Sequence, residues 1–159
     1  TFTTANLAKQ VTDSNKPIIH LATHGKFSSS VDETFILAWD RRIPVTELSA
    51  LLRSGDLNRP DPIELLILSA CETATGDDRA ALGLAGVALQ SGTRSTLASL
   101  WNLDDASGAV FIGQFYEALS RPNTTKAEAL RQAQLALFNN PNYRHPTYWS
   151  AYVLVGNWL

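Results

Sequence analysis

The sequence predicts an α/β protein with a mostly parallel sheet that is covered by helices on both faces. Three short segments carry this prediction: the almost uninterrupted apolar runs at residues 17–22 and 63–70, and residues 94–101, which have no charge after Arg94. Such runs are typical of strands that are buried on both sides, as in parallel sheets. Segments with helical spacing alternate with them, as βαβ units require. At 159 residues and 45% hydrophobic content, the chain can bury its own core without disulfides.

The first half of the chain alternates strands with one helix. The run over residues 17–22 predicts a strand that ends near Thr23, and a short strand is expected over residues 35–39. A helix should follow, with Thr46 as its cap. The run over residues 63–70 is the strongest signal for a buried strand in the chain.

The second half begins with a polar loop and a helix of small residues over positions 82–90. A third buried strand is expected over residues 94–101, followed by a helix over residues 106–119. The Thr-x-x-Glu capping box at Thr125 predicts the start of another helix. The last segment, residues 148–158, has the composition of a strand.

Composition and charge exclude several classes of function. The net charge is −2, from 13 basic and 15 acidic residues, so no basic excess favours nucleic acid. The longest stretch without Asp, Glu, Lys or Arg has 15 residues, which is too short to span a membrane. One cysteine and three histidines give no zinc-type spacing, and no phosphate-binding glycine loop is present. We therefore expect no metal, no cofactor, no nucleic acid and no membrane.

The chain is expected to be one domain, residues 1–159, from a longer protein. It begins with Thr1 and contains no methionine, so regulatory or repeat modules are expected before it. The sequence given shows no basic start followed by an apolar run, which would mark a signal peptide. A single cysteine with a reactive role suits a reducing compartment, and a cytoplasmic location is expected.

The only cysteine and one of the histidines follow two of the predicted strands. The first strand ends in Thr-His-Gly around His24, and the strongest ends in Ser-Ala-Cys at Cys71, 47 positions later. The carboxyl ends of parallel strands meet at one edge of a sheet, where ligand sites lie. A histidine beside a thiol favours the thiolate and can protonate a leaving amine. The pair predicts a cysteine nucleophile with a histidine base, and the spacing is similar to that of caspases.

Gly25 is a candidate functional residue, while structural roles stay open for the cysteine and the histidines. Gly25 allows a close backbone approach, and its N–H and that of Cys71 are candidates for an oxyanion hole. A lone cysteine at a strand end is also common as core filler. His20, inside the first strand, is interpreted as a core histidine bonded to backbone. His145 is interpreted as solvent-facing or structural.

Acidic residues near the predicted mouth of the site bear on substrate charge. Asp77, Asp78, Asp104 and Asp105 all follow predicted strand ends. An acid in the pocket would favour a basic P1 side chain by charge-assisted pairing. In the alternative interpretation, Asp104 or Asp105 caps the helix that begins at residue 106, and the other two acids lie in a solvated loop.

Five segments together resemble the CHAT domain family. They are IIHLATHGKF, LLILSACETATGDDRAALGLAGVALQSGTRSTLASLWNLDD, FYEAL, KAEALRQAQLAL and HPTYWSAYVLVGNW, in order from about residue 17 to residue 158. Members of this family are caspase- and separase-like proteins with a caspase-hemoglobinase fold, which implies a three-layer α/β sandwich. They often carry tetratricopeptide repeats before this domain, so a repeat or another regulatory module is an implied partner.

The resemblance implies a cysteine endopeptidase that acts on a protein or peptide substrate. The catalytic dyad of the family falls on His24 and Cys71, and its oxyanion donors fall on Gly25 and Cys71. The implied P1 pocket involves the segment after the third strand: Ser99, Leu100, Trp101 and Asp104, with Asp77 as a further candidate.

Two departures from the family pattern stand beside this resemblance. Many members read S-A-C-E-T-G followed by G-E-G, whereas this chain reads S-A-C-E-T-A-T-G-D-D, so the loop after Cys71 differs. The N-terminal regulatory half of full CHAT regions is absent from the sequence given.

Two other functions remain open at this point. In one, the domain is a catalytically silent caspase-like scaffold or interaction module that a partner remodels. In the other, the same dyad hydrolyses a small molecule in a closed pocket, although the chain contains no G-x-S-x-G elbow or cysteine equivalent.

Overall fold

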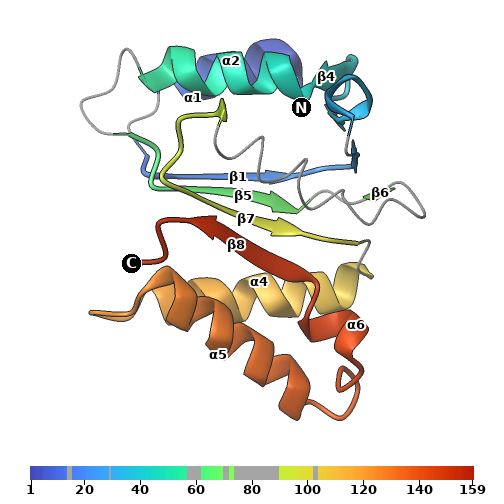
Figure 1. Ribbon diagram of the computed structural model, residues 1–159, viewed down its shortest axis with the longest axis vertical. Helices are drawn as coiled ribbons and strands as arrows, with labels where there is room; N and C mark the ends of the chain where they lie inside the picture. Colours follow the sequence, from blue (N-terminus) through green and yellow to red (C-terminus); the bar gives the residue numbers. More distant parts are fainter. Residues whose placement is uncertain (14–15, 29, 57–61, 70–71, 74–89, 102–103) are drawn as a thin grey trace.

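The computed structural model describes residues 1–13, 16–28, 30–56, 62–69, 72–73, 90–101 and 104–159. They form three layers (Figure 1). Helices α1 (Thr4–Asp13) and α2 (Val45–Asp56) lie side by side on one face of a central sheet. Helices α4 (Asp105–Leu119) and α5 (Lys126–Asn139) lie side by side on the other. The predicted α/β sandwich is confirmed.

The central sheet has the strand order β1-β5-β7-β8. Strands β1 (Ile18–Ala22), β5 (Leu65–Ser69) and β7 (Ser95–Ser99) are parallel. Strand β8 (Tyr152–Gly156) pairs antiparallel with β7 at one edge. The three buried runs of the sequence are the three parallel strands, and the sheet is mostly parallel as expected.

Side chains of β5 alternate between the two helical layers. Leu66 and Leu68 belong to the core beneath α1 and α2, and Leu65 and Ile67 belong to the core beneath α4 and α5. None of the four is more than 1% exposed. Burying each such side chain contributes roughly 1.5–3 kcal/mol. This two-sided burial explains why the segment shows no polar alternation.

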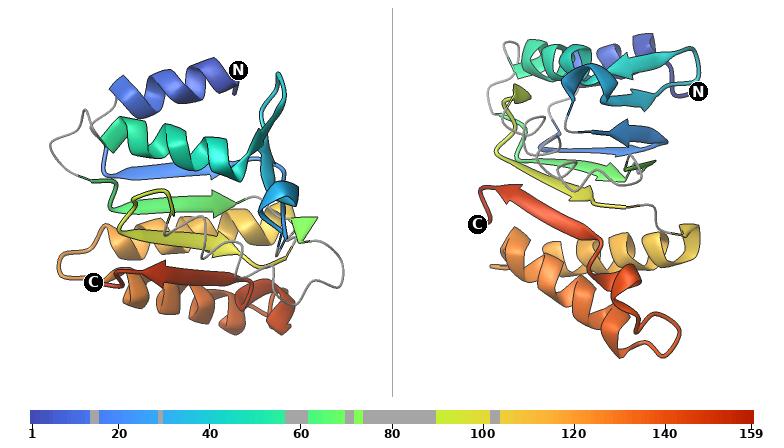
Figure 2. Two further views of the ribbon diagram at one scale, coloured as in Figure 1. Left: turned by 45° about the horizontal axis from the view of Figure 1, so that its top comes forward. Right: turned by 45° about the vertical axis from the view of Figure 1, so that its right-hand side comes forward.

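A smaller sheet lies beyond the carboxyl end of β1 (Figure 2). Its strand order is β4-β3-β2-β6. The strands are β2 (Gly25–Phe27), β3 (Phe35–Leu37), β4 (Arg42–Pro44) and β6 (Glu72–Thr73), and a 3-10 helix, η1 (Val31–Glu33), connects β2 to β3. Strand β2 pairs antiparallel with β3 and parallel with β6. The small sheet therefore joins the segment after His24 to the segment after Cys71.

Side-chain caps define the starts of two C-terminal helices. At α5, Thr125 Oγ1 accepts the N–H of Glu128 at 3.1 Å, so the Thr cap predicted from the capping box is confirmed. The short helix α6 (Pro146–Trp149) begins after His145, whose Nδ1 accepts the N–H of Thr147 at 3.3 Å. The interpretation of His145 as structural agrees with this contact.

Several local predictions are wrong. The N–H of Val45 donates to Thr34 O at 2.9 Å, and α2 begins at Val45, so Thr46 lies inside the helix and does not cap it.

Helix α1 and the strands β2, β4 and β6 were not predicted. Residues 148–149 belong to α6, which leaves only Tyr152–Gly156 as the last strand. The helix predicted over residues 82–90 lies, apart from Gln90, outside the described residues.

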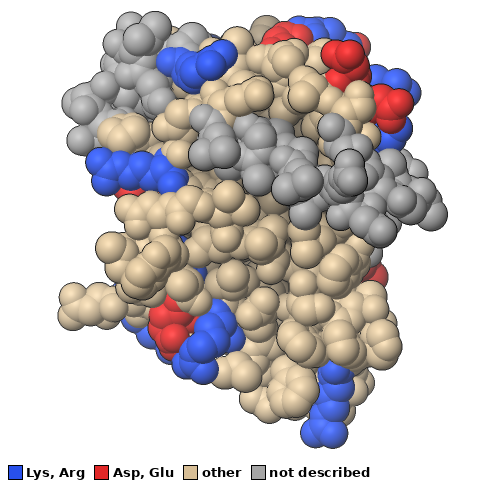
Figure 3. Space-filling model, viewed as in Figure 1, with Lys and Arg blue, Asp and Glu red and all other residues tan. Residues whose placement is uncertain are grey.

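The described surface shows separate groups of charge. On the face seen in Figure 3, its Lys and Arg side chains form no continuous basic patch of the kind that binds nucleic acid. No helix in the described part of the chain is long and apolar enough to cross a membrane. Among the same residues, no group of three or more His, Cys, Asp or Glu side chains could hold a metal ion.

Candidate active site

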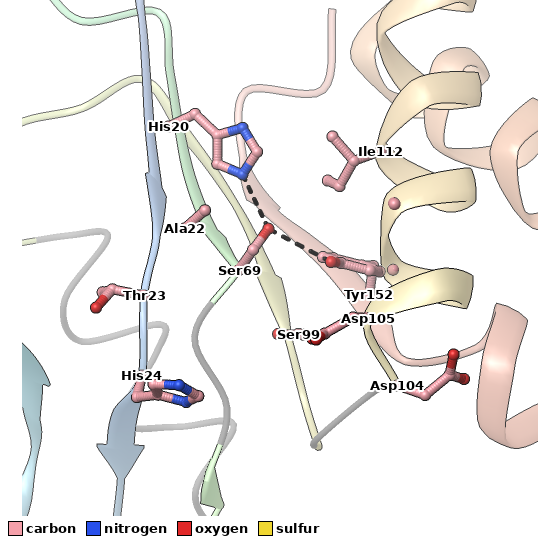
Figure 4. Close-up of a pocket in the computed structure, with 12 residues that line it drawn as sticks. His20, Ala22, Thr23, His24, Ser69, Ser99, Asp104, Asp105, Ile112 and Tyr152 are labelled. Carbon is pink, nitrogen blue, oxygen red and sulfur yellow. Dashed lines mark hydrogen bonds between the residues drawn. The ribbon is translucent and has the colours of Figure 1, made fainter.

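A pocket of about 380 Å³ opens at the carboxyl ends of β1, β5 and β7. Its walls come from these strand ends, the start of β8 and the first turns of α4 (Figure 4). His24, Ser99 and Asp104, three residues expected at the site, line it. The sequence predicted reactive residues at this edge of the sheet, where the carboxyl ends of the parallel strands meet.

His24 lies at the junction of the two sheets, directly after β1 and Thr23 and directly before β2. The N–H of Leu37 donates to His24 O at 2.7 Å. Beside it, Thr23 Oγ1 donates to Leu37 O at 2.6 Å. These two contacts hold the backbone of His24 against β3, while its side chain lines the pocket.

Gly25 is required by the close approach of β3. A Cβ atom at this position would lie 2.8 Å from the carbonyl oxygen of Phe35 and 3.3 Å from Ile36 Cα. Because the N–H of Leu37 donates to His24 O, Gly25 and Ile36 face each other as a non-hydrogen-bonded pair of the antiparallel ladder. The N–H of Gly25 therefore points away from β3, to the side of β2 where β6 lies. The oxyanion role of Gly25 stays a prediction.

Residues 70 and 71, and so Cys71 itself, lie outside the described residues, whereas Ser69 and Glu72 are described. In the central sheet, Ser69 pairs with Ala22, two positions before His24. In the small sheet, Glu72 pairs with Lys26, two positions after His24. Three residue steps from Ser69 to Glu72 span at most about 11 Å, and paired strands lie about 4.8 Å apart. Ser69 and Glu72 are thus each paired close to His24, on opposite sides of it in the sequence.

His20, Ser69 and Tyr152 line the pocket and belong to a hydrogen-bonded array, of which Figure 4 shows these three members. His20 Nε2 lies 2.9 Å from Ser69 Oγ, and His20 Nδ1 lies 3.2 Å from the hydroxyl of Tyr116 on α4. Ser69 Oγ lies 3.4 Å from the hydroxyl of Tyr152. Burial lowers the pKa of His20 below its usual value and raises that of Tyr116. The expectation that His20 bonds to backbone is wrong, because its partners are side chains.

The two acids at the start of α4 differ in their surroundings. Asp104 Oδ1 accepts the N–H groups of Ala106 (3.1 Å) and Ser107 (3.0 Å), and its Oδ2 accepts the Ser107 hydroxyl (2.6 Å). The Ser107 hydroxyl, together with these amides, lowers the pKa of Asp104. Asp104 is therefore the cap of α4, as one of the two interpretations held. Asp105 also lines the pocket, and Figure 4 shows its side chain directed toward Ser99.

The other residues expected in the pocket are spread more widely. Leu100 packs on the core beneath α1 and α2. Trp101 donates from Nε1 to Thr147 O at 2.8 Å, toward α6. Neither residue lines the pocket described above. Asp77 and Asp78 lie outside the described residues.

The sequence reasoning missed the functional potential of the array around Ser69. The available signal was a pair of polar residues, His20 and Ser69, in otherwise apolar strands. Their partners are far away in sequence, because Tyr116 is 96 positions from His20 and Tyr152 is 83 positions from Ser69. Only the fold brings these side chains together.

Comparisons with known proteins agree with this architecture. A family model described as the CHAT domain matches residues 1–157. Human tetratricopeptide repeat protein 28 (Homo sapiens) is 30% identical over 118 residues, which cover 72% of this chain. The matched part is 5% of that protein, so this chain spans about one-twentieth of the length of its curated relative.

Proposed function

This chain belongs to the CHAT domain family, and we propose that it is a cysteine endopeptidase whose dyad is His24 and Cys71. The observation that supports the proposal is the strand pairing around His24. Ser69 pairs with Ala22, two positions before His24, and Glu72 pairs with Lys26, two positions after it. The pocket lined by His24 adds space for a substrate.

The proposed reaction is acyl transfer through a thioester. The Sγ of Cys71 attacks the scissile carbonyl as a thiolate that His24 favours. His24 then gives a proton to the leaving amine, and water resolves the thioester with His24 as base. Acid–base catalysis of this kind contributes typically 10²–10⁴-fold in rate.

Two amides are proposed to stabilise the oxyanion that forms at the carbonyl. They are the N–H of Gly25 and the N–H of Cys71. The support for Gly25 is its register, since its N–H is directed away from β3. One donor of this kind is worth about 10²–10³-fold in rate.

Regulation by a tetratricopeptide repeat module is part of the same proposal. Its support is the curated human relative, which is named for such repeats and is much longer than this chain. A reducing environment keeps a catalytic thiol from oxidation, and on this ground we propose that the activity lies in the cytoplasm. Cleavage that rises when a repeat module is supplied would support this regulation, and an unchanged rate would contradict it.

A fluorogenic peptide library tests the proposal. The chain should cleave a subset of peptides, and Cys71→Ala and His24→Ala should each lose at least 10³-fold in kcat/KM while keeping the circular dichroism spectrum of the parent. His145→Asn is the matched control, because this exposed histidine caps α6 and asparagine is also a good cap. Cleavage that persists in Cys71→Ala would contradict the dyad. Hydrolysis of small esters that requires Cys71, without any peptide cleavage, would favour the small-molecule hydrolase instead.

A further inference from the structure

The array of Ser69, His20, Tyr116 and Tyr152 is not used by the proposed cysteine chemistry. Its members come from four elements, β5, β1, α4 and β8; Ser69, His20 and Tyr152 line the pocket, and Tyr116 contacts His20 from α4. A serine hydroxyl 2.9 Å from a histidine nitrogen is within the range of a nucleophile and its general base. The second nitrogen of the same ring contacts a third group, the Tyr116 hydroxyl, at 3.2 Å. Nucleophile, base and orienting group together are the geometric signature of an activated hydroxyl.

We propose that Ser69 is a second nucleophile, which His20 activates to accept the acyl group of small esters. In this step the Oγ of Ser69 bonds to the acyl carbon while the ester C–O bond breaks. The hydroxyl proton moves to Nε2 of His20 and from there to the departing alkoxide, which leaves as an alcohol. The product is an O-acyl serine, and the step needs no oxidant or further co-reactant.

The protonation state of His20 suits a base. Burial lowers the pKa of the ring, so His20 is neutral at pH 7. With its Nδ1–H donated to the Tyr116 oxygen, the lone pair of Nε2 faces Ser69 Oγ. Burial also keeps Tyr116 as a neutral phenol. A phenol orients the ring without the charge stabilisation that a carboxylate gives, so acylation is slower than in a Ser-His-Asp triad.

The pocket sets the size of the electrophile. Its volume of about 380 Å³ lies at the lower end of the range for small-molecule sites. The hydroxyl of Tyr152, 3.4 Å from Ser69 Oγ, is the nearby group that can donate to the acyl oxygen. Phe111 stacks on the Tyr152 ring, with the ring centroids 4.1 Å apart, and this contact holds the ring in place. A short acyl chain fits these dimensions.

Labelling in the Cys71→Ala background tests this proposal independently of the dyad. The probe is an alkyl fluorophosphonate, which modifies activated serines, and mass spectrometry of the digested protein locates the adduct. Ser69 should carry the label in folded protein and lose it in 6 M urea. Ser69→Ala should abolish the label, and Ser120→Ala should retain it, because Ser120 lies at the C-terminal end of α4 and does not line the pocket.

Two variants test whether His20 and Tyr116 activate Ser69 or whether Ser69 is labelled only because the probe can reach it. His20→Gln should lower the labelling rate at least tenfold. Tyr116→Phe, which removes one oxygen atom, should lower it severalfold and keeps the test valid if His20→Gln does not fold. p-Nitrophenyl acetate should give a burst of p-nitrophenol that requires Ser69. Folded protein without an adduct at Ser69, or equal labelling rates with and without the His20 and Tyr116 changes, would overturn the proposal.

Discussion

Replacing Gly25 by alanine perturbs the molecule where the two sheets meet. The added Cβ would lie 2.8 Å from the carbonyl oxygen of Phe35, about 0.6 Å short of the 3.4 Å at which ordinary contact begins. The nearest atoms include backbone atoms of Phe35 and Ile36, which cannot rotate away like the end of a flexible side chain. Strand β3 must therefore move away from β2, or β2 must tilt.

The magnitude follows from overpacking. Inserting a methyl group into a packed site typically costs about 1–3 kcal/mol. Gly25 is buried, and the hydrogen bond from Leu37 to His24 O lies next to the clash. We expect the upper half of that range, together with a displacement of His24. Alanine keeps the backbone N–H, so any loss of reactivity at Cys71 would come from this displacement and not from a missing oxyanion donor.

Urea unfolding followed by tryptophan fluorescence measures the stability change. Gly113→Ala in α4 is the matched control, because a Cβ there meets nothing within 4 Å and alanine favours a helix. The control should gain about 0.5–1 kcal/mol, whereas Gly25→Ala should lose stability and alkylate Cys71 more slowly. A Gly25→Ala protein as stable as the parent, with unchanged thiol reactivity, would refute the reasoning.

Three further predictions concern the scaffold. Gly156→Ala should lower the free energy of unfolding by about 1–3 kcal/mol, because φ at this position is +101° and a Cβ would clash with the carbonyl oxygen of Arg94. An unchanged midpoint in thermal or urea unfolding would contradict this. Thr125→Ala should cost about 1 kcal/mol by loss of the α5 cap, and Thr125→Ser should restore most of it; equal loss in both variants would argue against the cap. Because the pKa of Asp104 is lowered in the folded protein, its charge stabilises the fold at pH values above its pKa in the unfolded chain, about 3.9, and this contribution is lost as the pH falls through the folded pKa. Asp104→Asn should therefore lower Tm at pH 7 and have a smaller effect at pH 3. An equal effect at both pH values would contradict the assignment.

The central layer could be predicted from the sequence because its strands are buried on both faces. The run that contains β5 is almost wholly apolar, and Leu65 to Leu68 are all buried. Of the small sheet, only β3 was expected, as part of a short strand over residues 35–39. The other strands have two or three residues each, and β2 and β4 contain Lys26 and Arg42, so neither periodicity nor composition marks them.

Two further predictions from local sequence were wrong, at the start of α2 and at His20. Thr46 is a good cap by residue type, but the bond from Val45 N–H to Thr34 O extends the helix start to Val45. His20 resembles a filler in an apolar strand until the fold places Tyr116 and Ser69 beside it. In both cases the decisive partner is distant in the sequence, and tertiary contacts override the local preference.

The dyad is tested most directly by alkylation of Cys71 with iodoacetamide across a range of pH, in the parent chain and in His24→Ala. An ordinary cysteine becomes reactive near its free pKa of about 8.5. The proposed dyad predicts alkylation that begins well below pH 8.5 in the parent and moves up toward that value in His24→Ala. A Cys71 that reacts as an ordinary thiol in both proteins would contradict the dyad, since the proposed base would then have no effect on its thiolate.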